Sequence, residues 1–132
     1  MQVENINWEG KTILVAEDDI ANYKMVEMLL NQVHARVIWA ETGEEALFFA
    51  KHPELCIDAV LMDIQMPDLD GISATIQLKA NHPHLPVILL SSHVNSEQYI
   101  DMHNIFDGKL SKPIQKAKLM ETLQYCFEHA PA

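Results

Sequence analysis

Five short apolar runs, separated by segments with helical periodicity, constrain the fold of this chain more than any other feature. The runs are TILVA (12–16), ARVIWA (35–40), DAVLM (58–62), PVILL (86–90) and a weaker GKL (108–110). Unbroken apolar character is typical of strands that are covered on both faces, as in a parallel sheet. A strand–helix unit repeated five times predicts an α/β fold: an open, doubly wound parallel sheet with right-handed crossovers.

The segments between these runs carry helix signals of different strength. Two segments place apolar residues on one helical face: Val26, Leu29, Leu30 and Val33, and then Leu119, Leu123, Cys126 and Phe127. Thr42 and Glu45 form a capping-box pattern that predicts the start of a helix. Ile72 and Ile76 indicate a third helix, and residues 96–103 are the weakest helical candidate because they contain few apolar anchors.

Composition excludes several classes of function. Nine Lys and Arg against nineteen Asp and Glu give a formal charge of −10, which repels nucleic-acid backbones and anionic lipid surfaces. We therefore expect no direct nucleic-acid partner and no membrane contact, and no apolar run approaches the roughly 20 residues of a membrane helix. Cys56 and Cys126 form no CxxC motif, and we interpret them as reduced core thiols of a cytoplasmic protein.

Polar side chains stand at the carboxyl ends of four of the predicted strands. They are Glu17 and Asp18 after the first strand, Asp63 after the third, Ser91 after the fourth and Lys112 after the last. In open parallel sheets, ligands bind beyond the carboxyl ends of the strands, at the point where strand order reverses. We therefore expect these groups to converge on one site.

Three carboxylates at one point require a cation. Two unit charges about 4 Å apart repel by roughly 4 kcal/mol at an effective dielectric constant near 20. Oxygen ligands without His or Cys favour a hard divalent ion, and few carboxylates with space for water favour Mg²⁺ over Ca²⁺. Lys112 adds a fixed positive charge. This arrangement suits a phosphoryl group, whose oxygens the metal and the ammonium neutralise while a carboxylate attacks phosphorus in line.

The motifs around these residues resemble those of response-regulator receiver domains. They are ILVAEDD (13–19), LMDIQMPDLDG (61–71), LLSSH (89–93) and LSKPI (110–114), and the likeness extends from about Lys11 to Phe127. The resemblance implies a flavodoxin-like receiver fold with strand order 2-1-3-4-5. We assign residues 11–129 to this domain, residues 1–10 to an N-terminal extension or linker, and residues 130–132 to a tail.

The resemblance also implies a role for each group. Asp63 would accept a phosphoryl group from a histidine kinase or a phosphotransfer protein, while Ser91 and Lys112 would contact phosphoryl oxygens. The groups that would hold Mg²⁺ are Glu17 (through water), Asp18, Asp63 and the backbone carbonyl of Gln65. A downstream protein would bind the face made by the fourth helix, the fifth strand and the fifth helix. The domain would be no enzyme beyond catalysing its own phosphorylation and slow dephosphorylation.

Neighbouring residues receive supporting interpretations. Asp19 and Asp70 are expected to lie at helix N-termini, where carboxylates are favourable. Gly71 would let the next helix begin against the loop that offers Gln65. By resemblance, Gln65 and His93 border the phosphoryl group and would influence its lifetime.

Two positions depart from the receiver pattern. Lys109 stands three residues before Lys112, where Tyr or Phe is usual, and Ile105 replaces a usual Gly. These departures motivate an alternative function: a phosphate-independent (pseudo-receiver) interaction module that keeps the fold. The presence of every pocket residue argues against it.

Two further classes and the parent protein can also be weighed. A hydrolase is disfavoured because DIQ (63–65) lacks a second acid two residues after Asp63, and a flavodoxin-like electron carrier lacks a phosphate loop after its first strand. The entry segment INWEGKTILVAEDDIANY (6–23) is similar to that of receivers in hybrid sensor histidine kinases. We favour such a parent over a free-standing regulator.

Overall fold

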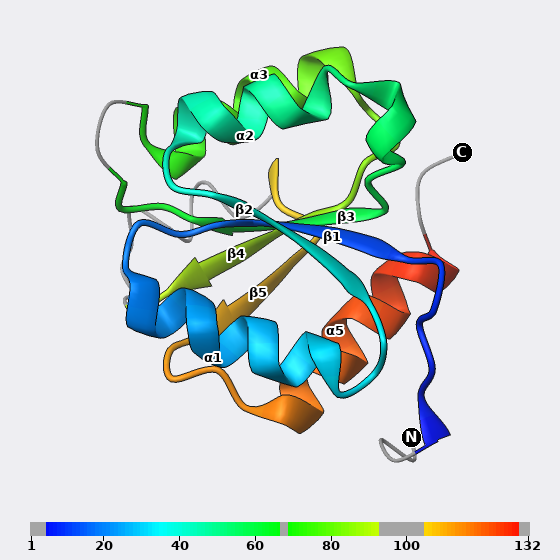
Figure 1. The fold of residues 1–132 in the computed structure, drawn as a ribbon. Helices are drawn as coiled ribbons and strands as arrows, with labels where there is room; N and C mark the ends of the chain where they lie inside the picture. Colours follow the sequence, from blue (N-terminus) through cyan, green and yellow to red (C-terminus); the bar gives the residue numbers. More distant parts are fainter. Residues whose placement is uncertain (1–4, 67–68, 93–104, 130–132) are drawn as a thin grey trace.

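A five-stranded parallel sheet forms the centre of the computed structural model, which describes residues 5–66, 69–92 and 105–129 (Figure 1). Its strands are β1 (Thr12–Ala16), β2 (Arg36–Ala40), β3 (Ala59–Asp63), β4 (Val87–Ser91) and β5 (Gly108–Ser111). Their order across the sheet is β2-β1-β3-β4-β5, and every neighbouring pair is parallel. The predicted fold class and strand order are therefore confirmed.

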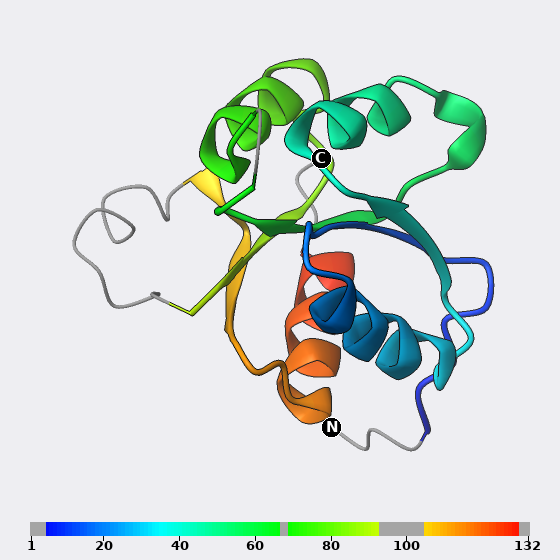
Figure 2. The same ribbon diagram turned by 60° about the vertical axis from the view of Figure 1, so that its left-hand side comes forward.

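Helices cover both faces of the sheet. Figures 1 and 2 show α2 (Gly43–Ala50) and α3 (Gly71–Asn81) on one face, and α1 (Ile20–Asn31) and α5 (Lys116–Glu128) on the other. A short 3₁₀ helix, η2 (Pro53–Leu55), follows α2. His93 and the helix predicted over residues 96–103 lie outside the described residues.

Side-chain caps determine where three of these helices begin. Asp19, Thr42 and Asp70 each accept a hydrogen bond from the backbone N–H three residues later, over 2.8–3.0 Å. Such caps satisfy N–H groups that have no partner inside the helix. In a standard capping box the carboxylate of Glu45 would accept the backbone N–H of Thr42. Here it accepts the N–H of the preceding residue, Glu41, at 2.8 Å.

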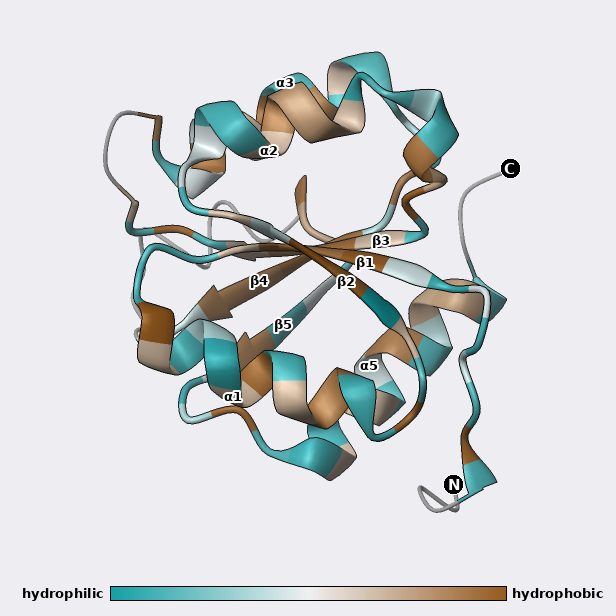
Figure 3. Cartoon of the chain, viewed as in Figure 1, coloured by the Kyte–Doolittle hydropathy of each residue, from teal (hydrophilic) through white to brown (hydrophobic). Residues whose placement is uncertain are grey.

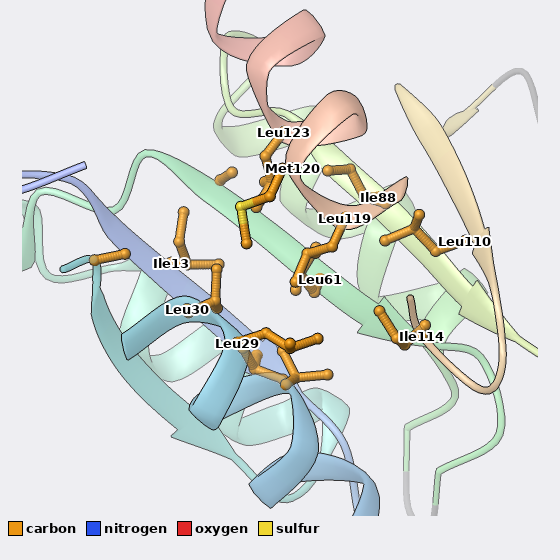
Figure 4. Close-up of a cluster of buried hydrophobic side chains, with 14 of the residues drawn as sticks. Ile13, Leu29, Leu30, Leu61, Ile88, Leu110, Ile114, Leu119, Met120 and Leu123 are labelled. Atoms are coloured by element: carbon orange, nitrogen blue, oxygen red, sulfur yellow. The ribbon is translucent and has the colours of Figure 1, made fainter. Parts of the chain in front are cut away.

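Apolar packing on both faces holds the strands in place. Every residue of β1, β3 and β4 is buried, and Figure 3 shows these strands as the most hydrophobic part of the fold. Between the sheet and helices α1 and α5, side chains such as Ile13, Leu30, Leu61, Ile88 and Leu123 form one cluster (Figure 4). A second cluster fills the space under α2 and α3. Strands packed in this way hold the residues at their ends in fixed positions.

The helix predicted from Ile72 and Ile76 forms, but it turns a different face to the core. The side chain of Ile76 is 52% exposed. The buried positions of α3 follow the i, i+3, i+4, i+7 pattern of one face and are Gly71, Ala74, Thr75 and Leu78. Three of these four residues are small, which allows α3 to lie close to the sheet.

Two other sequence interpretations need correction. Cys56 is exposed, not in the core; it ends η2 at the surface, in a left-handed backbone conformation with φ of 53°. Cys126 is buried as expected, and both thiols are free. Val33 is buried but lies beyond the end of α1, in the turn that leads to β2.

The described part of the N-terminal segment packs against the domain. Trp8 is 6% exposed, and its backbone N–H donates to the carbonyl of Val33 at 2.7 Å. Its indole donates to Gln124 at 3.3 Å and meets the ring of Phe127 edge to face at 5.2 Å. None of the helices in the described residues has both the length and the apolar character that a bilayer span requires.

Candidate functional site

Polar residues stand at the carboxyl ends of four strands of the sheet. Glu17 and Asp18 follow β1, Asp63 and Ser91 are the last residues of β3 and β4, and Lys112 follows β5. The register aligns Asp63 with Leu90 on β4, and Ser91 with Ser111 on β5, so these strand ends are level. Asp63 is 4% exposed and Ser91 is 3% exposed, so both lie within the protein rather than on its surface.

The three carboxylates that sequence reasoning singled out form a group. Glu17, Asp18 and Asp63 each offer an oxygen, and these oxygens lie within 4.8 Å of one another. Glu17 is almost fully buried and Asp18 is exposed, so the group opens to solvent on the Asp18 side. Carboxylate oxygens without nitrogen or sulfur ligands are the donor set that Mg²⁺ prefers.

Lys112 lies against two of the three acids. Its Nζ is 2.8 Å from Oε1 of Glu17 and 3.1 Å from Oδ2 of Asp63. Burial alone would lower the pKa of the Lys112 ammonium, but the hydrogen bond to Glu17 and the charge of Asp63 outweigh burial and raise that pKa. The side chain therefore supplies a permanent positive charge at the edge of the acid group.

One ammonium does not fully compensate the acids. Burial, a hydrogen bond with Asp63 and the Asp63 charge raise the pKa of Glu17 to about 7, although Lys112 and the N–H of Asp19 act in the opposite direction. The protein therefore resists ionising this carboxyl group near neutral pH. A divalent cation between the acids would remove the resistance, so the residues present fit a bound Mg²⁺ ion.

Hydrogen bonds hold both ends of the loop that follows Asp63. Oδ1 of Asp63 accepts the backbone N–H of Gln65 at 3.0 Å. At the far end, the N–H of Gly71 donates to the carbonyl of Ile64 at 3.2 Å. A Cβ atom at position 71 would lie 2.2 Å from the carbonyl oxygen of Asp63, so only glycine lets α3 begin here.

Sequence reasoning missed two residues that hold Glu17 from the neighbouring strand. The backbone N–H of Glu17 donates to the carbonyl of Ala40 at 3.0 Å. The indole N–H of Trp39 donates to the carbonyl of Glu17 at 2.8 Å. Trp39 and Ala40 end β2, and the sequence pattern marked both only as part of an apolar strand.

Lys109 and Phe106, the nearest aromatic residue in the sequence, lie in different surroundings. Lys109 is exposed, while its neighbour Leu110 is buried, because successive side chains of β5 point to opposite faces. Phe106 is half-buried and packs against Ile64 and Leu89. The position that usually holds an aromatic ring therefore presents an ammonium group to solvent.

Residues 13–124 match the family model described as "Response regulator receiver domain". The chain is 36% identical over 111 residues to the autoinducer 1 sensor kinase/phosphatase LuxN of Vibrio campbellii, covering 82% of this chain and 12% of LuxN. It is 33% identical over 121 residues to hybrid signal transduction histidine kinase I of Dictyostelium discoideum, covering 84% of this chain and 7% of that kinase. The chain thus spans only a small part of the length of these relatives.

A solved structure has the same fold. It is the receiver domain of the sensor histidine kinase PA1611 from Pseudomonas aeruginosa, with a magnesium ion coordinated in the active-site cleft. The TM-score is 0.82 at 30% sequence identity, and the match covers 90% of this chain and 98% of that domain.

Proposed function

The chain belongs to the response regulator receiver family, and we propose that it is the phosphoacceptor of a two-component phosphorelay. In this proposal Asp63 takes a phosphoryl group from a phosphohistidine of a histidine kinase or phosphotransfer protein, and the phosphorylated domain changes its partner interactions. One observation carries it: Asp63 is buried at a strand end, 3.1 Å from Lys112 and grouped with two further acids.

Each residue has a defined part in the transfer. A carboxylate oxygen of Asp63 attacks phosphorus, the bond from phosphorus to the donor imidazole nitrogen breaks, and its electron pair returns to that nitrogen. Lys112 then pairs with one phosphoryl oxygen, and the hydroxyl of Ser91 donates a hydrogen bond to another. The chain catalyses this transfer to itself and also the slow hydrolysis of its aspartyl phosphate, in which water attacks phosphorus, inorganic phosphate leaves and the Asp63 carboxylate is restored.

Mg²⁺ would be held by Asp18, Asp63 and the backbone carbonyl of Gln65, with Glu17 acting through water. When bound, the ion supplies positive charge that neutralises the phosphoryl oxygens during transfer. The acid group, the raised pKa of Glu17 and the magnesium ion in the related Pseudomonas domain support this assignment.

The phosphoryl donor would approach over the start of α1. Ile20 is the first residue of that helix, two positions after Asp18, and it is 59% exposed. A large apolar side chain beside an acidic opening is a suitable contact for a protein that must place a phosphohistidine there.

We place the downstream partner on the face of β5 and α5, where Lys109 and Tyr125 are exposed. The free thiols are consistent with a cytoplasmic location.

The exposed Lys109 keeps one alternative open for testing. A pseudo-receiver would bind partners without phosphate, because no aromatic side chain at this position could turn inward after phosphorylation. This alternative predicts that the domain binds its partner equally well with and without a phosphoryl group on Asp63.

Intact-mass measurement after incubation with acetyl phosphate and Mg²⁺ tests the proposal. The wild type should gain the mass of one phosphoryl group, and a chelator should prevent the gain. Asp63→Asn should gain nothing. Asp70→Asn is the matched control, because it changes an exposed acid of the same loop and Asn also caps helices well. A wild type that gains no mass, or an Asp63→Asn variant that still does, would exclude the phosphoacceptor function.

A further inference from the structure

We propose that Trp39 is a positioning residue that holds the Glu17 backbone so that the Glu17 carboxylate faces the metal site. This inference depends on the Mg²⁺ site of the proposed function. It adds a residue that lies outside the acid group and that sits on the edge strand β2.

The β1–β2 ladder stops one residue before Glu17. Its last aligned pair is Ala16 with Ala40, and the N–H of Glu17 then donates to the Ala40 carbonyl at 3.0 Å. The backbone of β2 supplies no partner to the Glu17 carbonyl. The Trp39 indole supplies it instead, at 2.8 Å, so two bonds from the end of β2 hold the peptide groups on both sides of the Glu17 Cα.

The side chain of Glu17 points the other way, into the acid group. Its Oε1 pairs with Lys112 at 2.8 Å and its Oε2 accepts the N–H of Asp19 at 3.2 Å. A rotation of the Glu17 peptide would move the carboxylate and displace Asp18, the next residue. The indole bond therefore restrains two of the three acids.

Trp39 is itself held in place. Its ring stacks on Tyr23 of α1 with centroids 4.4 Å apart and planes 8° apart. Tyr23 is 4% exposed, and its hydroxyl donates to Glu27 at 2.9 Å on the same helix. The indole thus links the edge strand, the acidic loop and α1, and movement of the loop on metal binding would change the surroundings of the ring.

Trp39→Phe tests this role, because it keeps a ring to stack on Tyr23 and removes the N–H donor. We expect the Mg²⁺ dissociation constant, measured by calorimetry, to rise about 3- to 10-fold, the range for loss of one hydrogen bond. The Mg²⁺ concentration for half-maximal phosphorylation by acetyl phosphate should rise by a similar factor. The rate at saturating Mg²⁺ should change less than about twofold, because the reacting groups of Asp63 and Lys112 remain.

Trp8→Phe is the matched control. It removes an indole bond to Gln124, on helix α5 away from the acid loop, and leaves Trp39 as the chain's one remaining tryptophan. The Mg²⁺ affinity of Trp8→Phe should equal that of the wild type. In this variant the fluorescence of Trp39 should change as Mg²⁺ is added, and the dissociation constant from that titration should match the one from calorimetry.

Two results would overturn the inference while leaving the proposed function intact: equal Mg²⁺ affinity in Trp39→Phe and Trp8→Phe, or Trp39 fluorescence that does not respond to bound Mg²⁺. A wild type that binds no Mg²⁺ in calorimetry would overturn both the inference and the metal site. The fluorescence titration needs no substitution at Trp39, so it decides the question even if Trp39→Phe folds poorly.

Discussion

Glu17→Gln is predicted to remove a pH dependence of stability from the metal-free protein. Glu17 has an ordinary pKa of 4.5 and a pKa of about 7 in the folded chain, chiefly because it is buried. Between these values the folded state binds the proton that the unfolded chain releases, so the free energy of unfolding falls as pH rises. At 1.36 kcal/mol for each pKa unit, the full loss is about 3 kcal/mol, and most of it falls between pH 5 and pH 8.

Urea unfolding in a chelator at pH 5 and pH 8 measures this effect in both proteins. Titrating groups that do not interact with Glu17 are common to the two proteins and cancel in the difference. We expect the free energy of unfolding of the wild type, relative to Glu17→Gln, to fall by about 2 to 3 kcal/mol from pH 5 to pH 8. A relative stability that stays constant between these pH values would refute the claim that Glu17 resists ionisation.

Three other substitutions test separate parts of the account. Ile20→Ala should slow phosphoryl transfer from a phosphohistidine protein and leave the reaction with acetyl phosphate unchanged; equal slowing of both would move the donor contact elsewhere. Gly71→Ala should destabilise the fold by about 1–3 kcal/mol in urea unfolding, because its Cβ meets the Asp63 carbonyl, and unchanged stability would contradict that close approach. Thr75→Val should raise the free energy of unfolding by up to about 1 kcal/mol, because the fully buried Thr75 hydroxyl has no hydrogen-bond partner among the described residues; a loss of stability would reveal such a partner.

The sheet was predictable from sequence because burial on both faces leaves a simple signal. The apolar runs placed every strand boundary within one residue of its observed position. These boundaries identified the residues that come directly after each strand, and so predicted that Glu17, Asp18 and Asp63 lie together. A parallel sheet brings the carboxyl ends of its strands together, so residues far apart in sequence could be grouped without knowing any side-chain conformation.

The missed features depend on distances between elements. Ile76 was an obvious apolar anchor, yet small residues such as Ala74 occupy the buried face of α3, and the backbone of Asp63 lies close against Gly71 at the start of the helix. Trp39 was interpreted only as part of an apolar strand. Its bond to the Glu17 carbonyl requires the indole to reach past the end of a neighbouring strand, and periodicity carries no information about that reach.

A crystal structure of the protein grown with Mg²⁺ and beryllium fluoride, a phosphoryl mimic, tests the central claim most directly. The account predicts the beryllium fluoride group on the carboxylate of Asp63, with Lys112 and Ser91 on its fluorine atoms and Mg²⁺ among Asp18, Asp63 and the Gln65 carbonyl. A mimic bound to any other side chain, or a metal ion bound away from these acids, would contradict it.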